Sequence, residues 1–481
     1  YTVGDPQQTQ ISFFSNVTFD STDQQCLPGY TGTLCGECAE NYVRVDNIEC
    51  SYCKGGPSLL LSFGVMGGAS GVFSIILAIM LRFCIKTTRS LDEAKEKTSG
   101  LIGQAKILLT FFQLLAACPG VMSTVPWPKL FIEMTSPLKM FNLNILNLFA
   151  GFPAFDGCGM SLPYLNQFII DMSFPGMIAL AIMMAYLLGK KDDEKQERRK
   201  ATLYKIVIML TLFLFPGIST SIFTMFRCVS VKGIEGTRLA AQLSVVCHEG
   251  QHATMTIVAL VFTVIYVVGT PLAIFVALWR NRAALHDENH PRHESVEFQL
   301  GSLYSSYEPK FWYFELIILV HKLFMTGVLV IVGDGTPAQP LAACVFQLFI
   351  LLLTLKLAPY SADTDDFSSL ISSMSLMLTM MCAFSLASSN ELLLTTFYCL
   401  IVVNFVTFAI EIGIMVSVWW QERKENIALR KAEEEEDKKD PERKIIREKR
   451  AKEIKLREKE TKARKKQEKQ DRKMKKKKIK K

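Results

Sequence analysis

Long apolar stretches, separated by short polar linkers, run through most of the chain. A helix needs about 20 predominantly apolar residues to cross the hydrocarbon core of a bilayer, so such stretches predict membrane-spanning helices. We place nine of them, at residues 58–85, 104–124, 166–189, 203–226, 253–279, 311–333, 338–357, 367–388 and 392–420. The pattern predicts an all-α polytopic membrane protein.

Composition divides the chain into three regions. The 481 residues are 49% hydrophobic, which is typical of a multi-pass membrane protein with soluble ends. We predict a cysteine-rich module at residues 1–57, a membrane domain at 58–420 and a charged helical tail at 421–481. Because the sequence begins at Tyr1 and shows no signal peptide, we expect a processed form or a fragment.

Five of the 13 cysteines precede the first predicted span, at Cys26, Cys35, Cys38, Cys50 and Cys53. This density predicts a disulfide-stabilised module in an oxidising compartment, and the odd number suggests a partner upstream of Tyr1. A four-cysteine zinc site is the alternative, because two pairs have C-x2-C spacing. A glycosylation sequon at Asn16 agrees with an exposed luminal segment.

The charges of the linkers predict the orientation. With the cysteine-rich module outside, nine spans leave the C-terminus in the cytosol, and we expect the plasma or ciliary membrane. The linkers predicted to be cytosolic are rich in Lys and Arg, as the positive-inside rule requires. These residues are Lys86, Arg89, Lys95, Lys97, Lys190, Lys191, Arg198, Arg199, Lys200, Arg280, Arg282 and Arg292.

Further cysteines lie at predicted outer linkers. Cys228 and Cys247 bracket one outer loop and are candidates for a disulfide, and Cys118 with Cys158 is a weaker second pair.

Ionisable residues inside predicted spans are the strongest functional signal. Glu315, His321 and Lys322 lie in the segment 308–333, and Glu411 lies in the last span. Charges at mid-depth are costly, so such groups usually face a bundle interior, a water-filled path or a partner. Glu315 and Lys322 are seven residues apart and share a helix face, which allows them to pair directly or through a polar neighbour.

Two other interpretations of these charges stay open. Lys322 can extend its ammonium toward the headgroups while its stem packs on apolar surface. The charged groups can also form a buried ion pair with a structural role only.

One motif suggests an enzyme. His248 and His252 fit H-E-x-x-H, in which two histidines one helical turn apart bind zinc. Gly250 weakens the helix that this motif needs, so the two histidines are weak metal candidates. We expect no catalytic site and no cofactor.

The linker 280–310 also carries three histidines, His286, His290 and His293, but Pro291 predicts a solvated loop there.

The tail is strongly basic. Residues 421–481 hold 28 Lys and Arg against 15 Asp and Glu, and their helical spacing predicts a solvated helix or coiled coil. The terminal lysines are expected to bind anionic lipid or the cytoskeleton, whereas the absence of interleaved aromatic residues argues against nucleic acid. These lysines are Lys473, Lys475, Lys476, Lys477 and Lys478.

The stretch 26–53, CLPGYTGTLCGECAENYVRVDNIECSYC, resembles the cysteine-rich repeats of epidermal-growth-factor and laminin type. Together with segments 226–285 and 300–366, it resembles a family of multi-pass membrane proteins of unicellular eukaryotes. That family is loosely grouped with transient-receptor-potential-like channels. The resemblance covers residues 26–420, and its most specific parts are the segment 304–333 and the pair Cys228 and Cys247. It implies a membrane sensor or a channel-like protein.

The residues leave three functions open. The first is a channel-like or signal-transducing protein whose polar centre is formed by Glu315, His321, Lys322 and Glu411. The links between the last spans are too short for a pore loop, so conduction needs another route, such as the linker 125–165 with Asn142, Asn144 and Asn147. For this linker we favour the alternative, a segment that lies along the membrane interface. The second is an adhesion receptor whose cysteine-rich module binds an extracellular partner. An outer-face zinc hydrolase is a remote third. A homo-oligomer is compatible with each.

Overall fold

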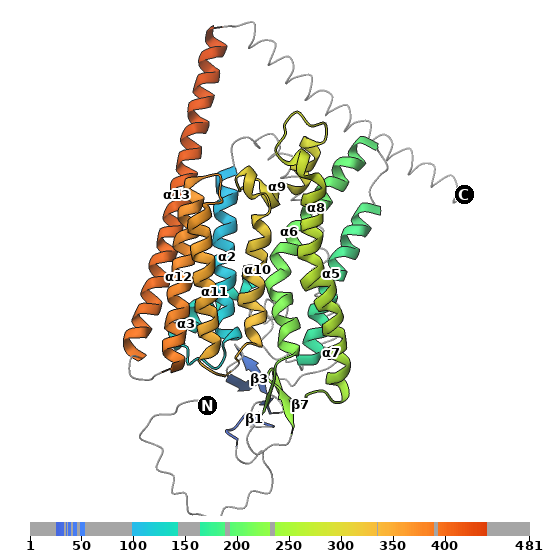
Figure 1. Cartoon of the computed structure of the whole chain (residues 1–481), viewed down its shortest axis with the longest axis vertical. Helices are drawn as coiled ribbons and strands as arrows, with labels where there is room; N and C mark the ends of the chain where they lie inside the picture. Colours follow the sequence, from blue (N-terminus) through green and yellow to red (C-terminus); the bar gives the residue numbers. More distant parts are fainter. Residues whose placement is uncertain are drawn as a thin grey trace, which may run out of the picture. The chain divides into compact units, whose positions relative to one another are not determined.

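The computed structural model describes residues 26–32, 35, 37–39, 42–45, 49–52, 99–142, 164–187, 193–230, 236–333, 335–388 and 393–439. Several predictions fall outside these residues. They are the first span at 58–85, glycosylation at Asn16, a disulfide of Cys53, the polar positions Asn144 and Asn147 of the linker 125–165, and the lysine-rich end of the tail. The described parts are mostly helical (Figure 1).

Alpha-helices account for most of the described chain. They are α2 (Ser99–Val121), α3 (Lys129–Thr135), α5 (Tyr164–Leu187), α6 (Asp193–Met225), α7 (Gly250–Phe262), α8 (Gly269–Leu285), α9 (His293–Tyr304), α10 (Phe314–Thr326), α11 (Ala338–Leu357), α12 (Asp363–Ser388) and α13 (Leu393–Lys439). Short helical turns lie between some of them: η3 (Pro137–Asn142), the π-helical η4 (Thr263–Val268), η5 (Pro309–Phe311) and η6 (Val328–Val330).

Six segments in the described residues are long and apolar enough to cross a membrane, so the chain is an integral membrane protein. They are Gly103–Val121, Ala201–Met225, Gly250–Leu285, Ala338–Leu357, Asp363–Ser388 and Tyr398–Gln421. The third is continuous through α7, η4 and α8. Each overlaps a span expected from the sequence, whereas the α5 and α10 segments are helical but are not among the six.

Helix α10 is shorter than the predicted span at 311–333. Its 13 residues extend for about 20 Å, less than the hydrocarbon thickness of about 30 Å. The helix ends at Gly327, where a Cβ would meet Cδ2 of Phe223 at 2.8 Å. Glycine allows α6 to approach here, and the chain then continues into η6 instead of a longer α-helix.

The cysteine-rich module forms two hairpins. β1 (Tyr30–Thr31) pairs with β2 (Glu37–Cys38), and β3 (Tyr42–Val45) pairs with β4 (Glu49–Tyr52). Disulfides join Cys26 to Cys35 and Cys38 to Cys50. This confirms the predicted disulfide framework for these four cysteines, and their sulfurs are not free to form the alternative zinc site.

A second small sheet follows α6. It contains β5 (Cys228–Ser230), β6 (Thr237–Leu239) and β7 (Gln242–Val246), and the predicted disulfide between Cys228 and Cys247 closes it. The predicted pairing of Cys118 with Cys158 is wrong, because Cys118 is a buried free thiol. Its Sγ lies 3.1 Å from the Leu114 carbonyl one turn earlier in α2.

Helices α2, α10, α11 and α12 lie side by side (Figure 1) and share one apolar core that includes Phe111, Leu115 and Met380. A second core joins α5, α6 and α7, and a third joins α6, α8 and α9. The prediction of a solvated loop at 280–310 is wrong over α9, because Val296, Leu300 and Leu303 bury an apolar stripe in the third core.

Helix α13 continues beyond its apolar part. Its residues from Met415 onward belong to a separate compact unit. There the helix exposes Trp419 and Trp420, and the Arg423 guanidinium lies 5.1 Å from the centre of the Trp419 ring. This is a cation–π contact on a helix that stays continuous to Lys439.

Candidate functional site

The four ionisable residues predicted to form an intramembrane centre are all buried. Glu315, His321, Lys322 and Glu411 are 5%, 3%, 6% and 2% exposed. The first three lie on α10, and Glu411 lies on the apolar part of α13. Burial at this level is unusual for ionisable groups that lack a partner, so their contacts decide the chemistry of the site.

Glu315 pairs with a residue that we did not single out in the sequence. The Lys106 ammonium on α2 donates to the Glu315 carboxylate at 2.7 Å and to the Ser302 carbonyl of α9 at 2.8 Å. The direct ion-pair partner of Glu315 is therefore Lys106, which corrects the direct pairing with Lys322 expected along α10. Tertiary packing of α2 against α10 brings a closer ammonium than the one two turns away.

Tyr307 completes the surroundings of Glu315. Its hydroxyl donates to the same carboxylate oxygen at 2.9 Å. Burial, and after it the charge of Glu315, raises the pKa of Tyr307 well above its ordinary value, so the phenol keeps its proton. Two backbone hydrogen bonds join the loop that carries Tyr307 to the loop between α11 and α12. The Glu308 amide donates to the Pro359 carbonyl, and the Ser361 amide donates to the Ser306 carbonyl.

A second carboxylate contact joins α2 to the start of α12. The Gln104 amide donates to Asp365 at 3.1 Å, and both side chains are buried. Gly103 makes this approach possible, because a Cβ there would lie 2.1 Å from the Asp365 Oδ2 atom. The absence of a side chain at residue 103 is a geometric requirement of the site.

His321 is held by an amide from the neighbouring helix. Its Nε2 lies 2.7 Å from Oε1 of Gln347 on α11, and the Gln347 amide nitrogen donates to the Ser373 carbonyl of α12 at 3.3 Å. Since an amide oxygen only accepts, the His321 proton on this side sits on Nε2. The contact links α10, α11 and α12 through buried polar atoms.

Glu411 is bound by two hydroxyl groups one helical turn apart. Ser368 and Ser372 of α12 each donate to a different carboxylate oxygen, Ser372 at 2.8 Å. Asn404 lies seven residues before Glu411, and it contacts Ser375 and Thr379, which lie seven residues after the two serines. The same hydroxyl pair thus repeats along the α12–α13 contact, once around a carboxylate and once around an amide.

A cavity of about 40 Å³ lies between these groups. At about 10–15 Å³ for each water, it has room for about three or four water molecules. Its lining includes Lys106, Tyr307, Glu315, His321, Tyr360 and Ser372. Because Ser372 also donates to Glu411, the cavity reaches from the Lys106–Glu315 pair on one side to the Glu411 contact on the other.

The histidines of the H-E-x-x-H sequence are arranged differently from a zinc hydrolase. Helix α7 begins at Gly250, so His248 precedes the helix, and its φ is +65°. The His248 amide donates to Nδ1 of His252 at 3.0 Å, and Nε2 of His252 donates to the Met225 carbonyl at 3.1 Å. The two rings therefore do not share a helix face as the motif requires.

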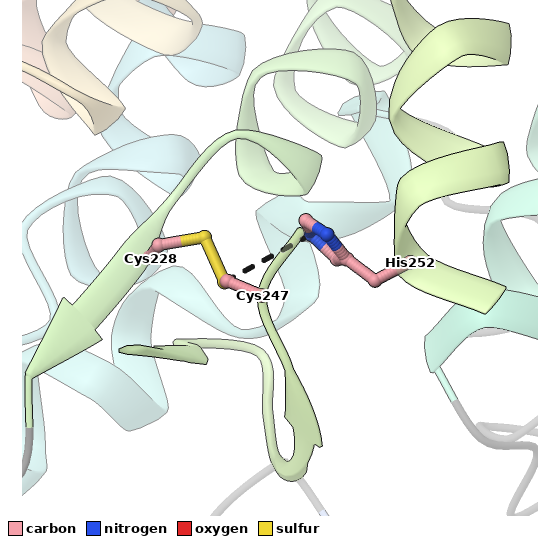
Figure 2. Close-up of side chains that lie close together, drawn as sticks. All are labelled: Cys228, Cys247 and His252. Carbon is pink, nitrogen blue, oxygen red and sulfur yellow. Dashed lines mark hydrogen bonds between the residues drawn. A yellow bond between two sulfur atoms is a disulfide. The ribbon is translucent and has the colours of Figure 1, made fainter. Parts of the chain in front are cut away.

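His252 instead lies beside a disulfide (Figure 2). Potential ligand atoms of Cys228, Cys247 and His252 lie within 4.8 Å of one another. Cys247 Sγ is 3.9 Å from the Nε2 atom of His252, but it is bonded to Cys228, and neither sulfur is a free thiolate. In this state the cluster closes the junction of the small sheet with α7.

Sequence reasoning missed Lys106, Gln347 and the hydroxyl groups of α12. Two signals were present. Lys106 is a charge inside a predicted span, and the buried positions Ser368, Ser372, Ser375 and Thr379 follow one helical face in α12. Both signals predict burial, but neither names the partner.

Comparison of the chain with protein-family models, with characterised proteins and with solved structures finds no match.

Proposed function

We propose that this chain is a channel-like or signal-transducing membrane protein in which an ion moves through, or is sensed at, the polar centre of the helical bundle. The observation that carries this proposal is the cavity that touches both the Lys106–Glu315 pair and Ser372, the donor to Glu411. Ionisable groups that face a water-sized space between apolar helices are characteristic of ion pathways and of sensors.

A structural ion pair explains less of the site. It would need only Lys106 and Glu315, whereas His321 and Ser372 line the same cavity from α10 and α12. The Glu411 carboxylate has a separate set of donors on α12. The polar groups Lys106, Glu315, His321 and Ser372 come from three helices, α2, α10 and α12, and converge on a single small space, which favours a role in ion binding over a role in packing alone.

The proposal includes an orientation. The disulfide-stabilised module, with a glycan at Asn16, faces the exterior, and the tail lies in the cytosol of a plasma or ciliary membrane. There the lysines at 473–478 bind anionic lipid. The N-terminal disulfides support an oxidising compartment on that side. The likeness to transient-receptor-potential-like proteins is consistent with this orientation, and a homo-oligomer is compatible with it.

The test is ion flux in liposomes that contain the purified chain. Glu315→Gln and Lys322→Met are compared with the intact protein, and each variant is first checked for folding by size exclusion. We expect flux in the intact protein and a changed rate in Glu315→Gln. The matched control is Glu308→Gln, since Glu308 pairs with Lys310 at the surface and does not line the cavity. Equal flux in all four proteins would contradict an ion pathway through the polar centre.

A second candidate function rests on the N-terminal hairpins. Two disulfides hold residues 26–52 in a compact arrangement, as in modules that bind other proteins. In this alternative the chain is an adhesion receptor that binds an extracellular partner. Deletion of residues 26–53 would then abolish capture of that partner on cells, whereas retained capture would count against the receptor role.

A further inference from the structure

We infer that the ion handled by the polar centre is the proton, exchanged between Glu315 and Glu411 through the cavity and the Ser372 hydroxyl. This inference rests on the proposed function and names its ion. Three features carry it: the size of the cavity, the mixture of charges around it, and the chain of groups that donate and accept protons.

The size of the cavity disfavours a metal cation. A divalent cation in proteins takes about six oxygen ligands, and a hydrated cation brings most of them as water. The cavity of about 40 Å³ has room for about three or four waters, fewer than the shell of a hydrated divalent cation. A proton needs no such shell, because it passes along a short row of waters and hydroxyl groups.

The charges around the cavity disfavour other ions as well. The Lys106 ammonium lines the cavity and repels a cation, and the Glu315 carboxylate lines it and repels an anion. The ammonium repels a proton too, but a proton can form a covalent O–H bond with the Glu315 carboxylate, which an inorganic cation cannot. The mixture of signs therefore disfavours inorganic ions of both kinds, and the carboxylate gives the proton a group to bind.

Titratable groups line the cavity or lie on the helices around it. Those that line it are Lys106 on α2, Glu315 and His321 on α10, and Tyr307 and Tyr360 in the adjoining loops. Lys322 on α10, Asp365 on α12 and Glu411 on α13 are buried but do not line it. Among these, the two carboxylates at the ends of the route are Glu315, at the cavity wall, and Glu411, behind Ser372.

Each transfer is a simple proton exchange. The O–H bond of protonated Glu315 breaks as a water in the cavity accepts the proton, and that water passes a proton to the Ser372 hydroxyl. Ser372 gives its own proton to the Glu411 carboxylate, to which it donates at 2.8 Å, and a new O–H bond forms there. No electrons are transferred, and the hydroxyl resets by rotation.

The Lys106 ammonium has a second acceptor apart from Glu315. When Glu315 is neutral, the ammonium loses its counter-charge but keeps its hydrogen bond to the Ser302 carbonyl at 2.8 Å. Its side chain is also 23% exposed, compared with 6% for that of Glu315. The ion pair can therefore open without leaving a buried ammonium that has no acceptor.

The experiment follows proton flux in liposomes with a trapped pH-sensitive dye, and the same preparations are tested in parallel with sodium, potassium and chloride indicators. We expect proton flux in the intact chain and a loss of about tenfold or more in Glu411→Gln and in Ser372→Ala. Glu411→Asp keeps the carboxyl group and should recover part of the flux. The control is Ser388→Ala, because Ser388 is exposed and bonds only to its own helix at Phe384.

Each result decides the matter. Undiminished proton flux in Ser372→Ala and Glu411→Gln would overturn the route. Flux of sodium, potassium or chloride without protons would overturn the choice of ion and leave the proposed function intact. If no ion moves under any gradient, both the channel function and this inference fail. Should Glu411→Gln misfold, Ser372→Ala decides alone, since Glu411 still receives the Ser368 hydroxyl.

Discussion

Lys106 and Glu315 form an ion pair at 2.7 Å although 209 residues separate them in the chain. The pair joins α2 to α10, and the same ammonium reaches the Ser302 carbonyl of α9. One side chain therefore ties three helices together at the edge of the cavity.

Lys106→Met should destabilise the protein by about 3 kcal/mol, because it leaves the buried Glu315 carboxylate without its cation. The measurement is thermal unfolding of the purified protein in detergent. The control is Lys310→Met, which breaks an exposed pair with Glu308 and should change stability by less than about 1 kcal/mol. Similar losses of stability in the two variants would show that the Lys106–Glu315 pair stabilises the protein no more than an exposed ion pair does.

Gly103→Ala should lower the stability of the helical bundle by about 1–3 kcal/mol, since the added methyl group would meet the Asp365 carboxylate and break its bond to Gln104. Gly120→Ala is the control in the same helix. Apart from its chain neighbours and the backbone of its own helix, no atom lies within 4 Å of a Cβ at that position, so this change should be neutral or slightly stabilising. The stability of both variants is measured by the melting temperature. An unchanged melting temperature for Gly103→Ala would contradict the close approach of Asp365 to Gly103.

Gln347→Leu should destabilise the protein by about 1–3 kcal/mol, because the buried His321 N–H would lose its acceptor. Gln299→Leu removes an amide that bonds only to Ser295 on the surface of α9, and it should have little effect. Denaturation of both variants under one set of conditions measures the difference. Equal stability would mean that His321 finds another acceptor.

Reduction of the Cys228–Cys247 disulfide should loosen the small sheet and the start of α7. The bridge closes a loop with a sequence separation of 19, for which a stabilisation of about 3 kcal/mol is typical. Hydrogen exchange at residues 237–252 with and without reductant measures this effect. The double variant Cys228→Ser with Cys247→Ser should exchange as fast as the reduced protein, and slow exchange in it would assign the protection to other contacts.

The sequence by itself determined which segments are apolar helices and which ionisable residues lie inside them. Spans near α2, α6, α11, α12 and α13 follow from hydrophobic length, and the disulfides of Cys26, Cys35, Cys38 and Cys50 follow from cysteine density in a short segment. The burial of Glu315, His321, Lys322 and Glu411 also follows, since charges in apolar helices avoid lipid.

Only the tertiary structure decided the partners. Periodicity along α10 pairs Glu315 with Lys322, because a helix places residues seven apart on one face. Packing brought Lys106 closer, and it brought Ser368 and Ser372 to Glu411 across two helices. Helical periodicity states which face a residue occupies, but the neighbour of that face depends on how distant segments dock. The sequence therefore identified the charges of the polar centre, whereas the fold determined its pairs and its cavity.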